Sequence, residues 1–267
     1  MAQCPVLSVV VPAFNERRTI AAVLPPVARS LPEVGKEIII VDDASTDGTR
    51  EWLLEQVGTA GLTGNHLVVD AHDGLQITNQ DSASPASLSV RAVFRDRNGG
   101  KGAALRSGFA HVSGDVVVVQ DADLEYRPAD WARMWPLIAE DDCADVVYGS
   151  RFYGYPHRSL YFHHYAGNRL ISRVFNVLYD QTLSDVEVGY KMMRREVLES
   201  LRLSKDDFGV ELEISAQIAL ARRWRIYELG VHYFGRTYEE GKKITWKDGL
   251  KALYYLLAMR VRRLPGQ

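Results

Sequence analysis

The sequence has few of the features that mark secreted, zinc-binding or membrane-spanning proteins. Its 267 residues include only two cysteines, Cys4 and Cys143, which lie far apart and have no CxxC spacing. This usage excludes a disulfide framework and a zinc site built on CxxC pairs. The longest apolar run, Ala252 to Met259, is much shorter than the roughly 20 residues that cross a bilayer. The first residues lack a basic region followed by an apolar stretch, so we expect no signal peptide and a cytoplasmic location.

The chain also lacks a strong net charge. Its formal net charge of -2 at pH 7 is far from the basic composition of nucleic-acid-binding proteins, so we expect no nucleic-acid partner. This average hides a basic segment, because residues 222–263 carry eleven Lys or Arg against four Asp or Glu. We therefore expect the C-terminal part of the chain to attract phosphate groups or anionic lipid headgroups.

The sequence does contain a regular alternation of apolar runs and helical patterns. Its 46% hydrophobic content is enough for one substantial core. Strands are predicted at 7–12, 37–42, 90–95, 115–120 and 145–149, and helices at about 17–30, 47–57, 101–112 and 129–139. Such an alternation is typical of α/β proteins with a mainly parallel sheet that is covered on both faces. The Pro25–Pro26 pair is expected to bend or split the first helix.

Residues 58–90 interrupt this alternation. They are rich in Gly, Asn, Ser and Asp and contain no Lys or Arg, which predicts an inserted surface loop with a short hairpin around Leu67 to Ile77. The segment also holds a polar group that matches no specific metal-binding spacing, so we interpret it as solvated. The members of this group are His66, Asp70, His72 and Asp73.

Two amphipathic helices are predicted in the second half of the chain, at 166–180 and 246–264. Apolar residues recur at helical spacing in both segments, and basic residues lie beside them. The stripes consist of Leu170, Ile171, Val174, Val177 and Leu178, and of Trp246, Leu250, Leu253, Leu257, Val261 and Leu264. Each helix either packs its stripe on the core or lies on a membrane surface, and the sequence leaves both alternatives open.

Three of the predicted strands end in acidic residues. Glu16 follows the first strand, Asp42 and Asp43 end the second, and Asp121 and Asp123 follow the fourth. Because the carboxyl ends of adjacent parallel strands open onto one crevice, we expect these carboxylates to gather at one edge of the sheet. Such a group favours Mg²⁺ or Mn²⁺, which keep coordination positions open for phosphate oxygens. The sequence therefore predicts an enzyme that binds a nucleotide diphosphate sugar.

Four strings then resemble a known family. They are V-V-V-P-A-F-N-E at 9–16, D-D-A-S-T-D-G-T at 42–49, N-G-G-K-G at 98–102 and D-A-D at 121–123. Together they are similar to the inverting family-2 glycosyltransferases with the GT-A fold, and most similar to the polyprenyl-phosphate sugar synthases such as dolichyl-phosphate mannose synthase. The resemblance implies a GT-A domain at 1–235 that contains the 58–90 insertion. It also implies that 236–267, a basic phosphate-binding loop and an amphipathic helix, belongs to the same unit.

The resemblance implies roles for the residues of these strings. Asp123 is the expected metal ligand and is central to catalysis, Asp121 contacts the nucleotide and the metal, and Glu125 is an additional ligand. The nucleotide pocket is expected to contain Pro12, Ala13, Phe14, Glu16, Asp42 and Asp43. The residues alone also fit an alternative with structural roles, in which Glu16 caps the first helix and Asp42 or Asp43 initiates a turn. Gly100 and Lys101 open a helix whose backbone N–H groups are expected to meet an anion.

Two later strings are similar to the polyprenyl-phosphate sugar synthases in particular. They are S-D-V-E-V-G-Y-K-M-M-R-R-E-V-L at 184–198 and R-T-Y-E-E-G-K at 236–242. By this resemblance Arg236 and Lys242 hold the diphosphate or the acceptor phosphate, and Arg151 with Arg169 helps to collect the acceptor.

The acceptor decides whether a catalytic base is needed. A hydroxyl must lose its proton as it attacks, whereas a lipid phosphate is already ionised, since the second pKa of a phosphate monoester is about 6. If the reaction uses a base, the candidates are Asp185, Glu211 and Glu213. Each of them is alternatively a structural partner of Arg194, Arg222 or Arg223.

Three functional hypotheses follow. The first is a metal-dependent, inverting transfer of a hexose from a UDP- or GDP-sugar to a polyprenyl phosphate, by an enzyme that contacts the membrane surface. The second keeps the fold and the donor but uses a soluble saccharide or small-molecule hydroxyl as acceptor. The third is a non-catalytic subunit that binds the nucleotide sugar. The intact D-A-D string argues against the third hypothesis.

Overall fold

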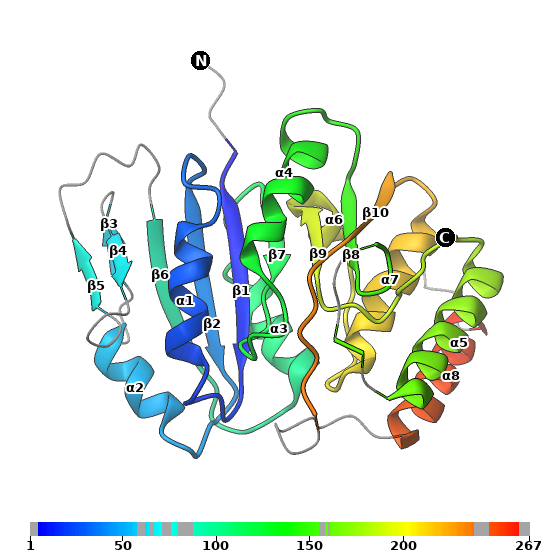
Figure 1. The fold of residues 1–267 in the computed structure, drawn as a ribbon, viewed down its shortest axis with the longest axis horizontal. Helices are drawn as coiled ribbons and strands as arrows, with labels where there is room; N and C mark the ends of the chain where they lie inside the picture. The colour runs from blue at the N-terminus through cyan, green and yellow to red at the C-terminus, as the bar shows by residue number, and fades with distance from the viewer. Residues whose placement is uncertain are drawn as a thin grey trace.

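The computed structural model describes residues 5–57, 62–64, 67–70, 76–79, 88–154, 158–159, 161–237 and 246–261, without side chains in the three short segments between 62 and 79 and at 246–248. Its centre is an eight-stranded sheet in the order β10-β8-β9-β7-β1-β2-β6-β3 (Figure 1). Neighbouring strands run parallel except where β9 pairs with β7 and β8 and where β3 pairs with β6. The strands are β1 (Leu7–Ala13), β2 (Lys36–Asp42), β3 (Leu62–Gly64), β6 (Leu88–Phe94), β7 (Val116–Val119), β8 (Val146–Ser150), β9 (Lys191–Arg194) and β10 (Ile226–Gly230). The predicted α/β class with a mainly parallel sheet is confirmed.

Helices cover both faces of the sheet. α1 lies beside the start of α4 on one face, and α3 lies beside α7 on the other, with α5 and α8 packed together against α7 (Figure 1). The helices are α1 (Ile20–Arg29), α2 (Thr49–Gln56), α3 (Lys101–Phe109), α4 (Trp131–Ala139), α5 (Phe162–Tyr179), α6 (Arg195–Ser200), α7 (Gly209–Ala221) and α8 (Trp246–Val261). Because both faces are covered, the central strands β1 and β7 are apolar almost throughout, and nearly all of their side chains are buried.

The first helix corrects one expectation. α1 is a single helix that continues through Pro25 and Pro26, so the proline pair does not split it. Because proline has no backbone N–H, Pro25 and Pro26 leave only the carbonyl groups of Ala21 and Ala22 without their helical hydrogen bonds. Ala21 is partly exposed and Ala22 is exposed, and both lie near the helix start. Val23, Leu24 and Val27 are buried in the core, and their packing holds the helix together.

The 58–90 segment contributes to two sheets. β3 pairs antiparallel with β6 and extends the main sheet, whereas β4 (Leu67–Asp70) pairs antiparallel with β5 (Gln76–Asn79). The pairing of β4 with β5 agrees with the predicted hairpin. Of the predicted solvated polar group, His66, His72 and Asp73 lie outside the described residues.

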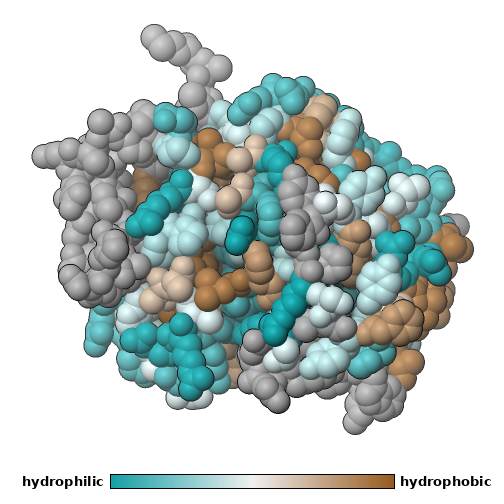
Figure 2. Space-filling model, viewed as in Figure 1, coloured by the Kyte–Doolittle hydropathy of each residue, from teal (hydrophilic) through white to brown (hydrophobic). Residues whose placement is uncertain are grey.

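The predicted amphipathic helices bury only part of their apolar stripes. Ile171 of α5 and Leu256 of α8 are buried in the core, but several large apolar side chains of both helices face outward. The exposed ones are Phe162, Tyr165, Leu170, Val177, Leu250, Tyr254, Leu257 and Val261. Figure 2 shows apolar side chains at the edge of the molecule where Figure 1 places α5 and α8. We call these eight exposed residues the α5–α8 apolar surface. None of the described helices has the length and apolar character needed to cross a bilayer.

Candidate functional site

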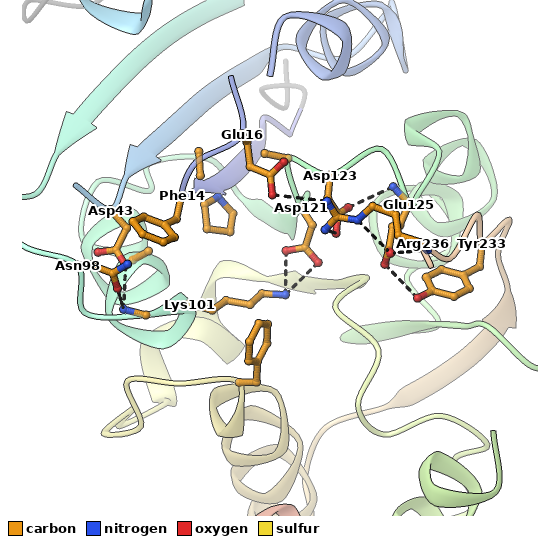
Figure 3. A pocket seen from close by; sticks show the side chains of 16 residues that line it. Phe14, Glu16, Asp43, Asn98, Lys101, Asp121, Asp123, Glu125, Tyr233 and Arg236 are labelled. Atoms are coloured by element: carbon orange, nitrogen blue, oxygen red, sulfur yellow. Dashed lines mark hydrogen bonds and ion pairs between the residues drawn. The ribbon is translucent and has the colours of Figure 1, made fainter. Parts of the chain in front are cut away.

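The carboxylates that follow β1, β2 and β7 line one cavity, as predicted. The cavity has a volume of about 240 Å³ and lies where these parallel strands end, which is the usual ligand position in such sheets. Figure 3 shows Glu16, Asp121 and Asp123 on one side of it and Lys101 opposite. We call it the first cavity. Its wall consists of Pro12, Ala13, Phe14, Glu16, Asp43, Asn98, Gly100, Lys101, Ala104, Asp121, Ala122, Asp123, Glu125, Phe208, Tyr233 and Arg236.

The glycine-rich turn before α3 is held by the protein itself. The Asp43 carboxylate accepts hydrogen bonds from the backbone N–H groups of Gly99 and Gly100, at 3.1 and 2.8 Å. The N–H groups of Gly102 and Ala103 donate to the carbonyl oxygen of Asp206. We expected the amides of this turn to meet a bound anion, but these four are already bonded. The anion at the start of α3 is Asp43, so this part of the prediction is wrong.

Lys101 connects the first cavity to a buried charge network. Its Nζ lies 2.8 Å from Asp121 Oδ1 and 3.0 Å from Glu211 Oε1, and the Nζ of Lys191 lies 2.6 Å from Glu211 Oε2. Burial alone would lower the pKa of Lys101, but the charges of Asp121 and Glu211 outweigh it and raise that pKa above its usual value. Burial raises the pKa of Glu211, but the two lysines dominate and lower it to about 2. Glu211 is therefore ionised and lies against both lysines.

Arg236 lies among three carboxylates on the other side of the cavity. Its Nη2 is 3.1 Å from Asp123 Oδ2, its Nε is 3.4 Å from Glu125 Oε1, and its Nη1 is 3.8 Å from Glu16 Oε1. Tyr233 donates its hydroxyl hydrogen to Glu125 Oε2 at 3.0 Å. Burial, together with the charges of Asp121 and Glu125, raises the pKa of Asp123 to about 7 in spite of Arg236. The negative charge at this wall thus exceeds what one guanidinium neutralises.

The chemistry of this wall fits a hard divalent cation. Asp121, Asp123 and Glu125 offer only oxygen donors, which Mg²⁺ and Mn²⁺ prefer. Within the part of the chain that the structure describes, no three His, Cys, Asp or Glu side chains are arranged to hold a metal ion unaided. Mg²⁺ is usually held by one or two carboxylates together with substrate phosphates, so such a cage is not required.

A second cavity of about 450 Å³ shares part of its wall with the first. The shared residues are Lys101, Asp121, Asp123, Glu125, Phe208 and Tyr233. From this shared wall the second cavity extends past Arg151 and Glu187 to Arg158 and to Phe162 and Tyr165 near the start of α5. The last two residues belong to the α5–α8 apolar surface, so the second cavity connects the carboxylates with that surface.

Arg151 is fixed in the wall of the second cavity by Asp185. Its Nε and Nη2 donate to the two carboxylate oxygens of Asp185, both at 2.7 Å, in a two-pronged ion pair. Asp185 is fully buried and does not line either cavity. This geometry gives Asp185 the role of orienting Arg151, so Asp185 is a structural partner of an arginine other than the expected Arg194, Arg222 or Arg223.

Three of the remaining predicted site residues contact other parts of the protein and not the cavities. Asp42 is fully buried and accepts a hydrogen bond from Arg50 Nε at 2.7 Å. Glu213 accepts hydrogen bonds from the N–H groups of Ser204 and Lys205, and it thereby holds the loop that contains these two residues. Arg169 donates to the Ser184 carbonyl oxygen at 3.2 Å. None of the three lines either cavity, and Lys242 lies outside the described residues.

Several wall residues were not singled out from the sequence. Phe208 and Tyr233 come from loops that the fold brings to the cavities, and no local motif marks them. Glu187 had a usable signal, since it lies two residues before Gly189. A Cβ atom at Gly189 would lie 2.8 Å from Asp121 Oδ2, so a larger residue would displace the Asp121 side chain, and glycine allows this close approach to the carboxylate wall. The glycine thus indicates that the segment around it lies at the site.

Comparison with known protein families agrees with this geometry. The model of glycosyl transferase family 2 matches residues 8–69 and 67–202. The chain therefore belongs to glycosyl transferase family 2, which confirms the predicted enzyme class. Among curated proteins, the chain is similar to glycosyltransferase AglJ of Haloferax volcanii, with 28% identity over 211 residues. This match covers 79% of the chain but only 57% of the relative's length.

Solved structures with a similar fold include glucosyl-3-phosphoglycerate synthase from Mycobacterium tuberculosis. Its complex with Mn²⁺, UDP and phosphoglyceric acid has a TM-score of 0.66 and 22% identity, over 98% of this chain and 81% of that one. Its complex with Mg²⁺ and UDP has a TM-score of 0.63 and 20% identity, over 98% and 82%. At this identity the likeness establishes the fold, and it agrees with the predicted GT-A architecture.

Proposed function

We propose that this protein transfers a hexose from a UDP- or GDP-sugar to the phosphate of a polyprenyl phosphate, with inversion at the anomeric carbon. The observation that carries the proposal is the pair of connected cavities. One is lined by the family's nucleotide-sugar strings, and the other leads from the same carboxylates to exposed aromatic residues of α5. This arrangement suits a polar donor on one side and a phosphate with a long apolar tail on the other.

The first cavity is the proposed donor site. Pro12, Ala13 and Phe14 at the end of β1 would enclose the nucleotide together with Glu16 and Asp43. Asp123, with Asp121 and Glu125, would hold Mg²⁺ or Mn²⁺ jointly with the diphosphate oxygens. When bound, the cation neutralises the charge that develops on the departing nucleoside diphosphate.

Arg236 is proposed to bind the diphosphate once the cation occupies the carboxylate wall. Its guanidinium now lies between Asp123 and Glu125, the same carboxylates that the cation would neutralise. Because a divalent cation supplies the positive charge that these carboxylates need, Arg236 becomes available to phosphate oxygens. Lys242 stays a predicted second phosphate contact from the same string.

The second cavity is the proposed acceptor site. Arg151, held rigid by Asp185, and Arg158 place positive charge in its wall, which suits a phosphate group. A phosphate nucleophile is ionised at neutral pH and needs no base. This fits the state of the candidate bases, because Asp185 is paired with Arg151 and Glu211 is paired with Lys101 and Lys191.

The α5–α8 apolar surface is proposed to rest on an anionic lipid surface. Phe162, Val177 and Val261 are 79%, 85% and 81% exposed, which is unusual for large apolar side chains and is concentrated on two adjacent helices. The exposed cations Arg173 and Lys251 belong to the same helices and would face lipid headgroups. A lipid phosphate taken from that surface would enter the second cavity past Phe162 and Tyr165.

A soluble phosphorylated hydroxyl compound is the second candidate acceptor. It is favoured by the solved structure of the M. tuberculosis synthase, which holds phosphoglyceric acid together with UDP and Mn²⁺. A hydroxyl acceptor would need a base in the second cavity, in contrast to a lipid phosphate.

The test is to offer UDP-glucose, GDP-mannose and related donors with Mg²⁺ or Mn²⁺, with farnesyl phosphate, with 3-phosphoglycerate or with simple sugars as acceptors. We expect a glycosylated lipid phosphate as product. Product only from phosphoglycerate or from a sugar hydroxyl would refute the lipid acceptor in favour of the soluble one. Binding of the nucleotide sugar without turnover on any acceptor would favour the non-catalytic subunit.

A further inference from the structure

Glu187 is a half-buried carboxylate that the proposed reaction does not yet use. It lies in the wall of the second cavity, and its Oε2 is buried without any hydrogen-bond partner among the described residues. Through Gly189, two residues further on, its segment touches Asp121 at the wall shared by both cavities. Glu187 therefore lies beside the path between the donor carboxylates and the acceptor entrance.

The two cations that act most strongly on Glu187, Arg151 and Lys191, are each paired with another carboxylate. Arg151 is paired with Asp185, Lys191 with Glu211, and Lys101 with both Asp121 and Glu211. These three cations thus already face three other carboxylates. Glu187 is a fourth carboxylate that shares these cations, and the incomplete compensation of its charge favours its protonated form.

The charged groups with the largest effects on Glu187 come from several elements. Arg151 follows β8, Asp185 precedes β9, Lys191 begins β9, and Glu211 is on α7. The other titratable or charged side chains in the wall of the same cavity are Lys101, Asp121, Asp123, Glu125, Tyr126, Arg158, Tyr161, His164, Tyr165 and Tyr233. Burial raises the pKa of Glu187 to about 7, the two cations Arg151 and Lys191 oppose this shift, and Asp185 and Glu211 add to it.

We propose that Glu187 is a specificity-determining residue that binds the acceptor as a neutral acid, donating its O–H hydrogen to a phosphate oxygen. This inference rests on the proposed function, because it takes a phosphate group as the nucleophile. An ionised carboxylate at this position would repel a phosphate. A carboxylic acid would instead donate a hydrogen bond to a phosphate oxygen, and this bond would also give its own unpaired oxygen a partner. Glu187 would thus favour phosphate acceptors over hydroxyl acceptors, which need a base instead.

The inference predicts a pH dependence of acceptor affinity. Because the bound form requires the proton, the dissociation constant should rise tenfold per pH unit once the pH exceeds the pKa of Glu187. Glu187→Gln keeps a hydrogen-bond donor but cannot ionise, so it should bind acceptor like the native protein at pH 6 and keep that affinity at pH 9. Glu187→Ala removes the donor and should weaken binding about 10- to 100-fold at pH 6.

The experiment is calorimetric titration of farnesyl phosphate into the full chain with Mn²⁺ and UDP, at pH 6 to 9. It compares the native protein with Glu187→Gln, Glu187→Ala and, as control, Glu199→Gln on the exposed face of α6. The result that supports the inference is a steep alkaline loss of affinity in the native and control proteins that Glu187→Gln abolishes. An equal pH slope in Glu187→Gln and native protein would overturn it.

Turnover separates the remaining outcomes. A Glu187→Gln protein that binds farnesyl phosphate normally at pH 6 but loses turnover more than 100-fold would identify Glu187 as a proton acceptor and overturn the inference. A native protein that does not bind farnesyl phosphate at all would overturn the proposed function, and this inference with it. Normal glycolipid formation by the native protein, with no effect of either variant, would overturn the inference alone.

Discussion

Replacing Glu211 with glutamine tests the charge network that links the two cavities. Glu211 lies between Lys101 and Lys191, at 3.0 and 2.6 Å, and Lys191 is only 1% exposed. The variant keeps the size of the side chain but leaves Lys191 buried without a carboxylate. Breaking a buried ion pair on one side costs about 3–5 kcal/mol.

The pKa of Glu211 gives an independent magnitude. Its pKa is lowered from 4.5 to about 2 by the two lysines, although burial acts in the opposite direction. At 1.36 kcal/mol per unit this corresponds to about 3 kcal/mol of stability. Since the folded pKa is depressed, the contribution is fully present above pH 4.5 and is lost as the pH falls toward 2.

The assay is urea unfolding at pH 7, with Glu199→Gln on the surface of α6 as the control. We expect Glu211→Gln to lower the free energy of unfolding by about 3 kcal/mol and the control to lower it by less than about 0.5 kcal/mol. We also expect the difference between the variant and the native protein to shrink between pH 4.5 and pH 3. A loss below about 1 kcal/mol at pH 7 would refute the reasoning that Lys191 depends on Glu211.

Arg236→Ala should lower kcat/KM for the nucleotide sugar about 10²- to 10³-fold while Arg236→Lys recovers part of it, and an unchanged value in steady-state kinetics would exclude a role at the diphosphate. The double variant Val177→Glu and Val261→Glu should no longer co-sediment with phosphatidylserine vesicles but should keep its turnover of farnesyl phosphate. If the native protein is instead a dimer that this variant dissociates in ultracentrifugation, a second copy of the chain occupies the α5–α8 apolar surface. Gly102→Ala should destabilise the fold by about 1–3 kcal/mol in urea unfolding, because its Cβ would lie 2.1 Å from the Lys205 carbonyl oxygen, whereas the α5 control Gly167→Ala, with open space around it, should not be destabilising.

The first half of the fold was predictable because its strands are long, apolar and regularly spaced. The runs at 7–12 and 37–42 became β1 and β2 with a shift of one residue at most at either end. The predicted wall of the first cavity followed from the same pattern, since Asp43, Asp121 and Asp123 all lie at strand ends. Only Asp42, one residue before Asp43, lies behind the wall, because it is bonded to Arg50 rather than facing the cavity.

The second half was less predictable because its buried charges are neutralised by distant residues. β9 begins with Lys191, whose burial is tolerated only because Glu211 of α7 lies against it. β9 is also short and antiparallel to both neighbours, so the alternation of parallel strands and helices gave no indication of it. Apart from the signal of Gly189, Glu187 could not be recognised as a site residue, since the balance of charge around it depends on which lysines and arginines the fold has already paired.

The requirement for a cation at Asp123 is tested most directly by the rate of glycosyl transfer to farnesyl phosphate in native protein and in Asp123→Asn, with Mn²⁺ and with excess chelator. We predict that the native protein forms product only with Mn²⁺ and that Asp123→Asn, verified as folded by its unfolding curve, is at least about 100-fold slower. A folded Asp123→Asn protein that forms product at the native rate in the presence of chelator would contradict the account.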